Sequence, residues 1–316
     1  MEKRRLGATD LEITPLVFGG NVFGWTIDEK TSFELLDHFA GSGFNCIDTA
    51  DSYSRWAPGN SGGESETIIG KWMKSRKKRT DVIIATKVGS DMGNGKKGLS
   101  KSYILKACED SLRRLNTDHI DLYQTHFDEP ETPVEETLSA YQQLIKDGKV
   151  RWIGASNITP ERLKESLGAS EGAGIASYQT LQPHYNLYAR EEFENGLEPI
   201  CLGNNLGVIT YYSLASGFLT GKYRSQEDFD KSPRGGGMAK FLDDRGKRIL
   251  AALDKVSGEM NSTPATVALA WLINRPSVTA PIASATSISQ LDSLLEAPKL
   301  ELGAEAIRYL TSESAW

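Results

Sequence analysis

Hydrophobic and polar residues alternate along this chain with two periods, and the two kinds of segment follow each other almost from end to end. Short apolar runs rich in β-branched residues predict strands, and longer stretches with an apolar residue every three or four positions predict amphipathic helices. The predicted strands lie at 16–20, 44–48, 82–87, 120–126, 150–156, 177–182, 207–212 and 278–283. The helical stretches between them include 29–41, 64–75, 101–115, 134–147, 160–168 and 289–297.

Eight alternating strand–helix units in 316 residues predict an α/β fold of the (β/α)8 TIM-barrel type, with residues 1–316 forming a single domain. Two short strands near residues 5 and 13, around "GATD", predict an N-terminal β-hairpin that plugs one end of the barrel. Thr159-Pro160 and Thr263-Pro264 predict helix starts, because a threonine cap followed by proline at the first helical position is typical there.

The strand–helix rhythm breaks after the seventh strand. Residues 222–246 are long, polar and rich in glycine, and an extra helix at about 245–259 precedes the helix that begins at Pro264. A long loop at the carboxyl end of a barrel strand is a candidate lid over an active site. A flexible connection without such a role is the alternative.

Composition narrows the class of protein. A net charge of -6 argues against a nucleic-acid partner, whose phosphates require a basic surface. The first residues do not resemble a signal peptide, and no apolar run approaches the ~20 residues of a membrane span. Three cysteines without paired spacing are typical of a reducing compartment, so we expect a cytoplasmic protein. The expected partner is a small molecule, and the oligomeric state stays open.

Polar groups follow nearly every predicted strand at its carboxyl end, where the active sites of such barrels lie. The second strand ends at Asp48, with Tyr53 in the loop that follows it. The third and fourth strands end at Lys87 and His126. The fifth, sixth and seventh strands end in Ser156 and Asn157, in Gln182, and in Tyr211 and Tyr212. Because the chain has four histidines and no His-x-His pair, we expect no metal.

Asp48, Lys87 and Tyr53 predict acid–base chemistry. Asp48 and Lys87 leave neighbouring strands at the same level and can pair, which places the ammonium beside the phenol of Tyr53. A nearby cation is expected to lower the pKa of the phenol from its ordinary value of about 10. Such a phenol can protonate an oxygen and take the proton back, and His126 can donate to the same oxygen. Reduction of a carbonyl by hydride is the reaction that these groups suit.

Several ordered segments resemble the aldo-keto reductases, in particular bacterial members with "PHYNL" after the sixth strand. The segments are "GFNCIDTADSY", "VIIATKVG", "DLYQTH", "RWIGASN", "LQPHYNL" and "YYSLASGFLTGKY", and the resemblance extends from about residue 3 to about residue 300. It implies a catalytic tetrad and a nicotinamide cofactor that is bound without a Rossmann domain. The implied tetrad consists of Asp48, Tyr53, Lys87 and His126.

The resemblance also implies where the cofactor binds. Ser156, Asn157 and Gln182 would hold the carboxamide, and Tyr211 would stack on the nicotinamide ring. The other residues implied to line the cofactor are Gly19, Gly20, Asn21, Asp48, Ser213, Leu214, Ser216, Gly217, Ala283, Ser284, Thr286 and Gln290. Small residues at 213–217 would let backbone N–H groups approach the pyrophosphate.

One departure from the family concerns the choice of cofactor. Many members have Lys or Arg after the eighth strand for the adenosine 2′-phosphate, whereas this chain has "IASATSISQLD". Arg224 or Arg234 of the long loop is the candidate to supply that charge. NADP(H) is the favoured cofactor, and NAD(H) is the alternative.

Trp25, Trp56 and Phe127 follow strand ends and are expected to contact the substrate. Two functions remain open at this point. The first is an NADP(H)-dependent oxidoreductase for a carbonyl or secondary alcohol, with Tyr53 as general acid and base. The second is a redox-sensing regulatory barrel that binds the nucleotide and turns over little, as some members associated with ion channels do.

Overall fold

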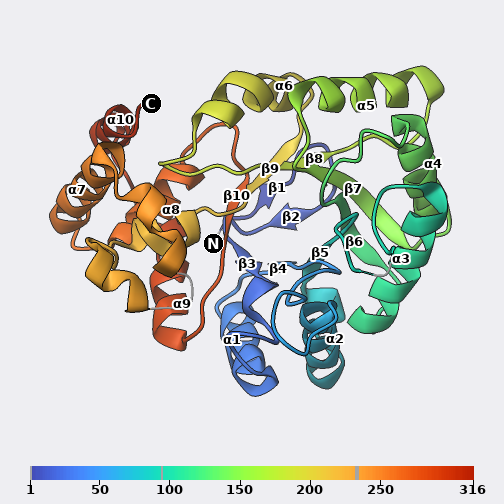
Figure 1. Cartoon of the computed structure of the whole chain (residues 1–316), viewed down its shortest axis with the longest axis horizontal. Coiled ribbons are helices and arrows are strands. Elements are labelled where there is room, and N and C mark those ends of the chain that lie inside the picture. Colours follow the sequence, from blue (N-terminus) through green and yellow to red (C-terminus); the bar gives the residue numbers. More distant parts are fainter. Residues whose placement is uncertain (1, 94, 232–234) are drawn as a thin grey trace.

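A closed barrel of eight parallel strands forms the centre of the computed structural model, which describes residues 2–93, 95–231 and 235–316 (Figure 1). Strand β10 pairs with both β9 and β3 and closes the ring. The strands in barrel order are β3 (Val17–Gly19), β4 (Cys46–Asp48), β5 (Ile83–Val88), β6 (Ile120–Thr125), β7 (Val150–Ser156), β8 (Thr180–Gln182), β9 (Gly207–Thr210) and β10 (Ala280–Ala283). The predicted (β/α)8 fold is confirmed. Each strand lies within its predicted segment except β5, which extends one residue further, to Val88.

Helices surround the barrel, and α7 and α10 lie side by side outside that ring (Figure 1). The helices are α1 (Glu29–Gly41), α2 (Glu64–Arg76), α3 (Lys101–Leu115), α4 (Val134–Lys146), α5 (Pro160–Ala173), α6 (Glu198–Gly203), α7 (Asp244–Glu259), α8 (Pro264–Ile273), α9 (Ile288–Leu295) and α10 (Ala304–Glu313). Thr159 and Thr263 cap α5 and α8 as predicted, each accepting a backbone N–H three residues later. The extra helix is α7, whereas the sequence reasoning missed α6 and α10. None of the helices in the described ranges is long and apolar enough to span a bilayer.

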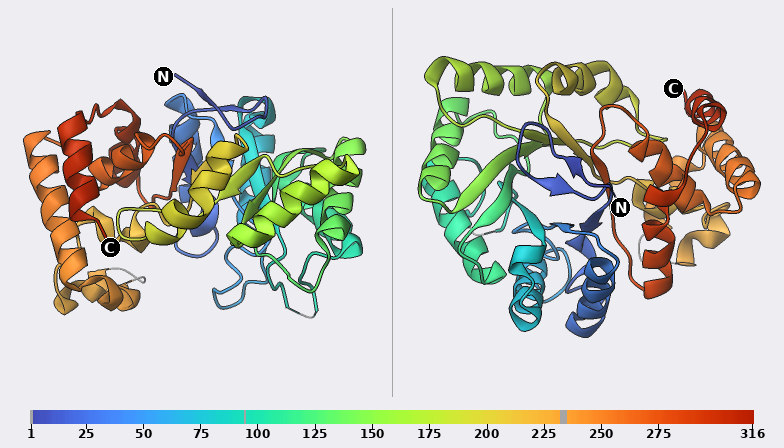
Figure 2. Two further views of the ribbon diagram at one scale, coloured as in Figure 1. Left: turned by 90° about the horizontal axis from the view of Figure 1, so that it is seen from above. Right: turned by 180° about the vertical axis from the view of Figure 1, so that it is seen from behind.

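The N-terminal hairpin closes one end of the barrel, as predicted. Its strands β1 (Arg4–Arg5) and β2 (Glu12–Ile13) are antiparallel and flank the buried Leu6 and Leu11. These apolar residues pack against inward-facing strand residues, namely Val17, Cys46, Ala85, Leu122, Ile209 and Ala280. Figure 2 shows the hairpin at one end of the molecule and the long loops after β4 and β5 at the other.

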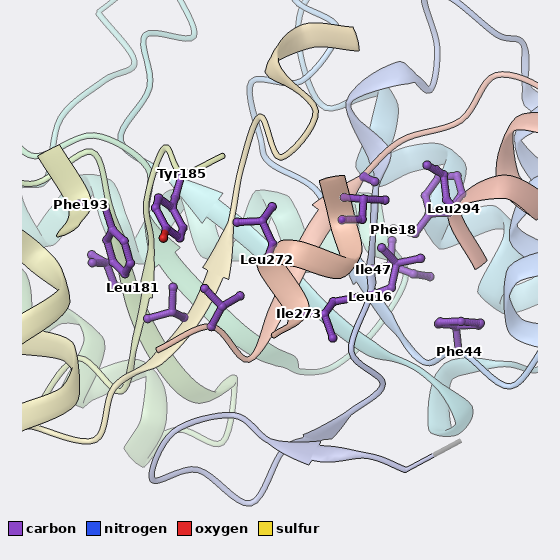
Figure 3. Close-up of a cluster of buried hydrophobic side chains, with 14 of the residues drawn as sticks. Leu16, Phe18, Phe44, Ile47, Leu181, Tyr185, Phe193, Leu272, Ile273 and Leu294 are labelled. Atoms are coloured by element: carbon purple, nitrogen blue, oxygen red, sulfur yellow. The ribbon is translucent and has the colours of Figure 1, made fainter. Parts of the chain in front are cut away.

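Strand alternation decides which side chains enter the barrel. Phe18 and Ile47 face outward and join the core between the strands and the helices, where Leu294 of α9 also lies (Figure 3). Their neighbours face inward, because successive side chains of a strand point to opposite faces. On β4 the inward residues are Cys46 and then Asp48. The same alternation turns Ala85 and Lys87 of β5 inward, so both charged groups enter the open end of the barrel.

The segment after β9 has more structure than a simple loop. Three short 3₁₀ helices occupy the described part of the predicted loop at 222–246: η5 (Gln226–Lys231), η6 (Gly235–Gly237) and η7 (Ala239–Phe241). Phe241 is buried, with its ring 5.2 Å from that of Phe218 and 4.9 Å from that of Tyr188. The end of the segment is therefore anchored on the protein. Its role as a lid stays a prediction, and Arg234 lies outside the described residues.

Candidate active site

The predicted tetrad is assembled at the open end of the barrel. Lys87 is fully buried, and its ammonium lies 2.7 Å from Asp48 Oδ2 and 2.9 Å from the hydroxyl of Tyr53. It also donates to the backbone carbonyl of Thr49 at 2.8 Å. The hydroxyl of Tyr53 lies 3.2 Å from Asp48 Oδ2, and the ring of His126 lies 6.0 Å from the ring of Tyr53. Carboxylate, amine, phenol and imidazole thus share one pocket.

The electrostatics of Tyr53 differ from the expectation. Tyr53 as a whole is half-buried. Burial nevertheless raises the pKa of the phenol well above its ordinary value, and the negative charge of Asp48 adds to the rise. The prediction of a lowered pKa is therefore wrong in direction. The ammonium of Lys87 is paired with Asp48, and the negatively charged carboxylate of Asp48 also lies next to the phenol. Tyr53 consequently keeps its proton at neutral pH, as a proton donor must.

Lys87 and His126 have shifted pKa values as well. Burial lowers the pKa of the Lys87 ammonium, and the neighbouring Asp48 opposes that change. Burial also lowers the pKa of His126 well below its ordinary value, and the positive charge of Lys87 adds to this. His126 is therefore a neutral imidazole that contacts Ser90 Oγ through Nδ1 at 2.9 Å. Its remaining ring nitrogen, Nε2, is the one left for a ligand.

The residues predicted to bind the carboxamide form one hydrogen-bonded group. Ser156 Oγ donates to the backbone carbonyl of Gln182 at 2.8 Å, and Asn157 Nδ2 donates to Ser156 Oγ at 3.2 Å. The hydroxyl of Tyr211 donates to Asn157 Oδ1 at 2.7 Å. The ring of Tyr211 stacks on that of His184, with centroids 5.3 Å apart. The structure thus brings these predicted residues together beside the tetrad.

The remaining predicted cofactor residues lie at or just after the carboxyl ends of β3, β9 and β10. Ser284 Oγ donates to Asn21 Oδ1 and joins the end of β10 to the segment after Gly19 and Gly20. The Thr286 backbone N–H and Oγ1 both donate to Gln290 Oε1, at 2.9 and 3.0 Å. Ala283 is buried and pairs with Phe18, one residue before Gly19. The residues predicted for the nicotinamide ribose and those predicted for the adenosine side therefore meet at the open end of the barrel.

The backbone after β9, which is predicted to contact the pyrophosphate, has an unusual conformation. Ser216 and Gly217 have positive φ values of 57° and 100°, a region that is costly for residues other than glycine. Ser213 Oγ is tied to the backbone carbonyl of Thr210, and Leu214 accepts the Gly217 N–H. A Cβ added to Gly217 would lie 3.7 Å from Lys222 Nζ. An ammonium therefore lies next to the segment predicted to contact the pyrophosphate.

Aromatic side chains flank the tetrad on the solvent side. Trp56 and Phe127 are 53% and 49% exposed, unusual values for such large apolar groups. The ring of Trp56 lies 6.2 Å from that of Tyr53 and 5.5 Å from that of Trp25, and Phe127 stacks on His126 at 4.8 Å. The three residues predicted to contact the substrate thus line one mouth. Tyr212, which is 53% exposed, adds a fourth ring that was not assigned from the sequence.

Several other residues near the site were missed. Ser90 and Lys222 looked like ordinary loop residues, although Lys222 follows the "FLTG" turn in the motif "YYSLASGFLTGKY". Behind the tetrad, the buried Glu66 accepts from Arg114 Nε at 2.6 Å and from Thr86 Oγ1 at 2.6 Å. Arg224 forms two contacts of 2.7 Å with Asp254. Among the described residues, no group of three or more His, Cys, Asp and Glu side chains is arranged to hold a metal ion.

A carboxylate, an amine, a phenol and an imidazole at the strand ends of a closed parallel barrel form a group that can carry out proton transfer at an oxygen. The aldo/keto reductase family matches residues 15–314 of the chain. The chain belongs to this family. It is therefore an oxidoreductase that uses a nicotinamide cofactor on carbonyl or alcohol substrates.

Curated relatives match along nearly the whole chain. "Uncharacterized oxidoreductase YrpG" of Bacillus subtilis (strain 168) is 34% identical over 98% of this chain and 95% of its own length. "Aldo-keto reductase YhdN" of the same organism is 33% identical over 96% of this chain and 91% of its own length. "Probable voltage-gated potassium channel subunit beta" of Arabidopsis thaliana is 30% identical over 94% of this chain and 91% of its own length.

Proposed function

We propose that this protein is an NADP(H)-dependent reductase of aldehydes or ketones, with Tyr53 as the general acid and base. The observation that supports this most directly is the position of Lys87, whose ammonium contacts both Asp48 Oδ2 and the phenol. The phenol keeps its proton because burial and Asp48 raise its pKa. A proton donor held in this way suits a reaction in which negative charge develops on a carbonyl oxygen.

The chain's own residues would orient the carbonyl and supply the proton. The bound nicotinamide supplies the hydride. Tyr53 gives its proton to the carbonyl oxygen, and the Lys87 ammonium stabilises the phenolate that remains. We propose that Ser90 Oγ–H donates to His126 Nδ1, which lies 2.9 Å away, so that the imidazole proton is on Nε2 and can donate to the same oxygen. In alcohol oxidation the same groups act in reverse.

The residues present fit a dinucleotide. The carboxamide group of Ser156, Asn157 and Gln182 would hold the nicotinamide, and Tyr211 would cover one face of the ring. The left-handed backbone at 215–217 leaves space for the pyrophosphate, because Gly217 has no Cβ there. Lys222 would supply a positive charge to it. Arg224 is already paired with Asp254, which weakens its candidacy for the 2′-phosphate.

Cofactor selectivity is expected to be modest. Lys222 lies near the pyrophosphate segment, and a pyrophosphate is common to NADPH and NADH. Lys222→Met should therefore weaken both cofactors alike, by about tenfold or more, the scale of one charge-assisted hydrogen bond. Arg224→Ala should leave the ratio of the two affinities nearly unchanged. Fluorescence titration of both cofactors with each variant measures these effects.

Two outcomes would contradict this account of the cofactor site. One is a preference for NADPH above about 10³-fold that persists in both Arg224→Ala and Arg234→Ala, since the 2′-phosphate would then bind elsewhere. The other is a Lys222→Met variant with the affinities of the parent. A loss of preference confined to Arg234→Ala would instead assign selectivity to the long segment after β9.

The substrate is proposed to be a carbonyl compound with a flat, apolar body. The exposed rings of Trp56, Phe127 and Tyr212 around the tetrad support this, because exposed aromatic groups gather where an apolar ligand covers them. We also propose a cytoplasmic location, which the three free and buried cysteines support.

A redox-sensing role is the second candidate, and the resemblance to a probable potassium-channel β subunit favours it. Turnover separates the two functions. The enzyme should oxidise NADPH with an activated aromatic aldehyde at an ordinary rate, which an absorbance assay measures. Tight cofactor binding with fewer than about one turnover per minute would support the sensor instead, since ordinary enzymes reach about 1–10³ per second.

A further inference from the structure

Two buried amides run from the Asp48 carboxylate into the interior of the barrel. Gln182, the last residue of β8, donates through Nε2 to Asp48 Oδ1 at 2.9 Å. The same nitrogen lies 3.4 Å from Oε1 of Gln124 on β6. Both glutamine side chains are buried, at 2% and 0% exposure. Gln124 is not a member of the tetrad and was not among the residues predicted to bind the cofactor.

The carboxylate fixes the direction of these hydrogen bonds. An ionised carboxylate only accepts, so the Gln182 atom that faces it is the NH₂ nitrogen. The second proton of that nitrogen points to Gln124, which therefore presents its oxygen. Gln124 Nε2 is left without a hydrogen-bond partner among the described residues. With its oxygen toward Gln182, the amide of Gln124 leaves a buried donor unpaired, which costs free energy.

The two oxygens of Asp48 consequently have different tasks. Oδ1 is held by Gln182, whereas Oδ2 contacts Lys87 at 2.7 Å and accepts from Tyr53 at 3.2 Å. A carboxylate held on one oxygen cannot turn freely about its Cβ–Cγ bond. Its other oxygen stays directed at the two groups that handle the proton.

A glycine on the intervening strand leaves room for this arrangement. Gly154 of β7 lies between Gln124 of β6 and Thr180 of β8 in the strand register. A Cβ at Gly154 would collide with Thr180 Oγ1 and come within 3.2 Å of Gln124 Cγ. Because Gly154 has no side chain, Gln124 can reach across β7 toward Gln182. From the strand pattern alone, a residue with a larger side chain would be expected at position 154.

We propose that Gln124 is a positioning residue, which acts through Gln182 to hold the Asp48 carboxylate with Oδ2 toward Lys87 and Tyr53. This proposal rests on the proposed function, because the reaction is the one in which Tyr53 gives up its proton. Gln124 is not assigned to the substrate or cofactor site, and it reaches that site only through Gln182. Its removal should therefore alter the rate of the chemical step and leave binding in place.

Gln124→Leu tests the proposal with little change in volume. We expect kcat to fall by about 10- to 10²-fold, the scale of a small misplacement of catalytic groups, with the KM for substrate and the Kd for NADPH nearly unchanged. Thr180→Val is the matched control, because its buried hydroxyl has no hydrogen-bond partner among the described residues and lies in the same layer. It should keep the kcat of the parent.

Nuclear magnetic resonance gives a second measurement that does not depend on turnover. In Gln124→Leu, the Asp48 ¹³Cγ resonance and one Gln182 side-chain amide proton should shift, whereas Thr180→Val should leave both in place. The Asp48 and Gln182 signals are assigned from Asp48→Asn and Gln182→Leu. Unshifted signals in Gln124→Leu, or an unchanged kcat, would overturn the proposal. If the parent reduces no carbonyl, the proposed function fails, and the two resonances alone decide whether Gln124 orients Asp48.

Discussion

Tyr53→Phe should bind NADPH as the parent does and lose about 10²-fold or more in kcat, the usual contribution of general acid–base catalysis. The substitution removes the hydroxyl that Lys87 contacts at 2.9 Å and leaves the ring in place. Asp48 and Lys87 keep their own contact of 2.7 Å, so the pocket should retain its shape. Steady-state kinetics with an activated aldehyde and fluorescence titration of the cofactor measure the two effects separately.

Tyr309→Phe is a suitable control for the loss of a phenol, because Tyr309 lies on α10, outside the barrel. Near-parental turnover in Tyr53→Phe would show that another group supplies the proton. The parent also offers a pH test. Since burial and Asp48 raise the pKa of Tyr53, the phenol should remain protonated to a higher pH than an ordinary tyrosine does. Carbonyl reduction by the free enzyme should therefore show no loss from deprotonation of Tyr53 over the pH range in which an ordinary tyrosine is protonated.

Strand ends were the part of the site that the sequence predicted best. Asp48, Lys87 and His126 each end an apolar run, and in a parallel barrel such ends meet at one rim. Their contacts follow from that topology. The direction of the Tyr53 pKa shift did not, because burial of the phenol is its main cause and the charge of Asp48 adds to it. The predicted pairing of Lys87 with Asp48 gives no measure of that burial.

Other features depend on contacts that no local pattern contains. Glu66 looks like an ordinary acidic residue in the first turn of α2, yet it is buried against Arg114, 48 positions later. In the sequence, Gln124 looks like an ordinary polar strand residue. Its special position becomes evident only from the strand register, in which Gly154 lies beside it. The missed helix α6 contains Pro199 and directly follows a π-helical turn at Phe193–Leu197, which disrupts the period of 3.6 residues.

Lys87→Met should destabilise the fold as well as the reaction. The Asp48 side chain, which is 1% exposed, would then be buried without the ammonium that it pairs with. Breaking a buried ion pair from one side costs about 3–5 kcal/mol, because the remaining charge is uncompensated. The double variant Asp48→Asn/Lys87→Met removes both charges, so it should recover much of that loss in spite of being inactive. Urea unfolding followed by circular dichroism measures the free energy of unfolding of each variant.

The exposed pair of Lys71 and Glu29 provides the matched control. Its atoms are 2.6 Å apart, but the two side chains are 58% and 47% exposed, so Lys71→Met should cost about 0–1 kcal/mol. Both substitutions remove one positive charge, so the difference between their losses in free energy of unfolding measures the effect of burial. One contrary result is a Lys87→Met variant that is as stable as Lys71→Met. Another is a double variant whose loss of stability equals the sum of the losses in Asp48→Asn and in Lys87→Met. Either result would show that the Asp48 carboxylate does not depend on Lys87 for its charge. The Lys87 contact with Tyr53 would then be the main reason for a lysine at that position.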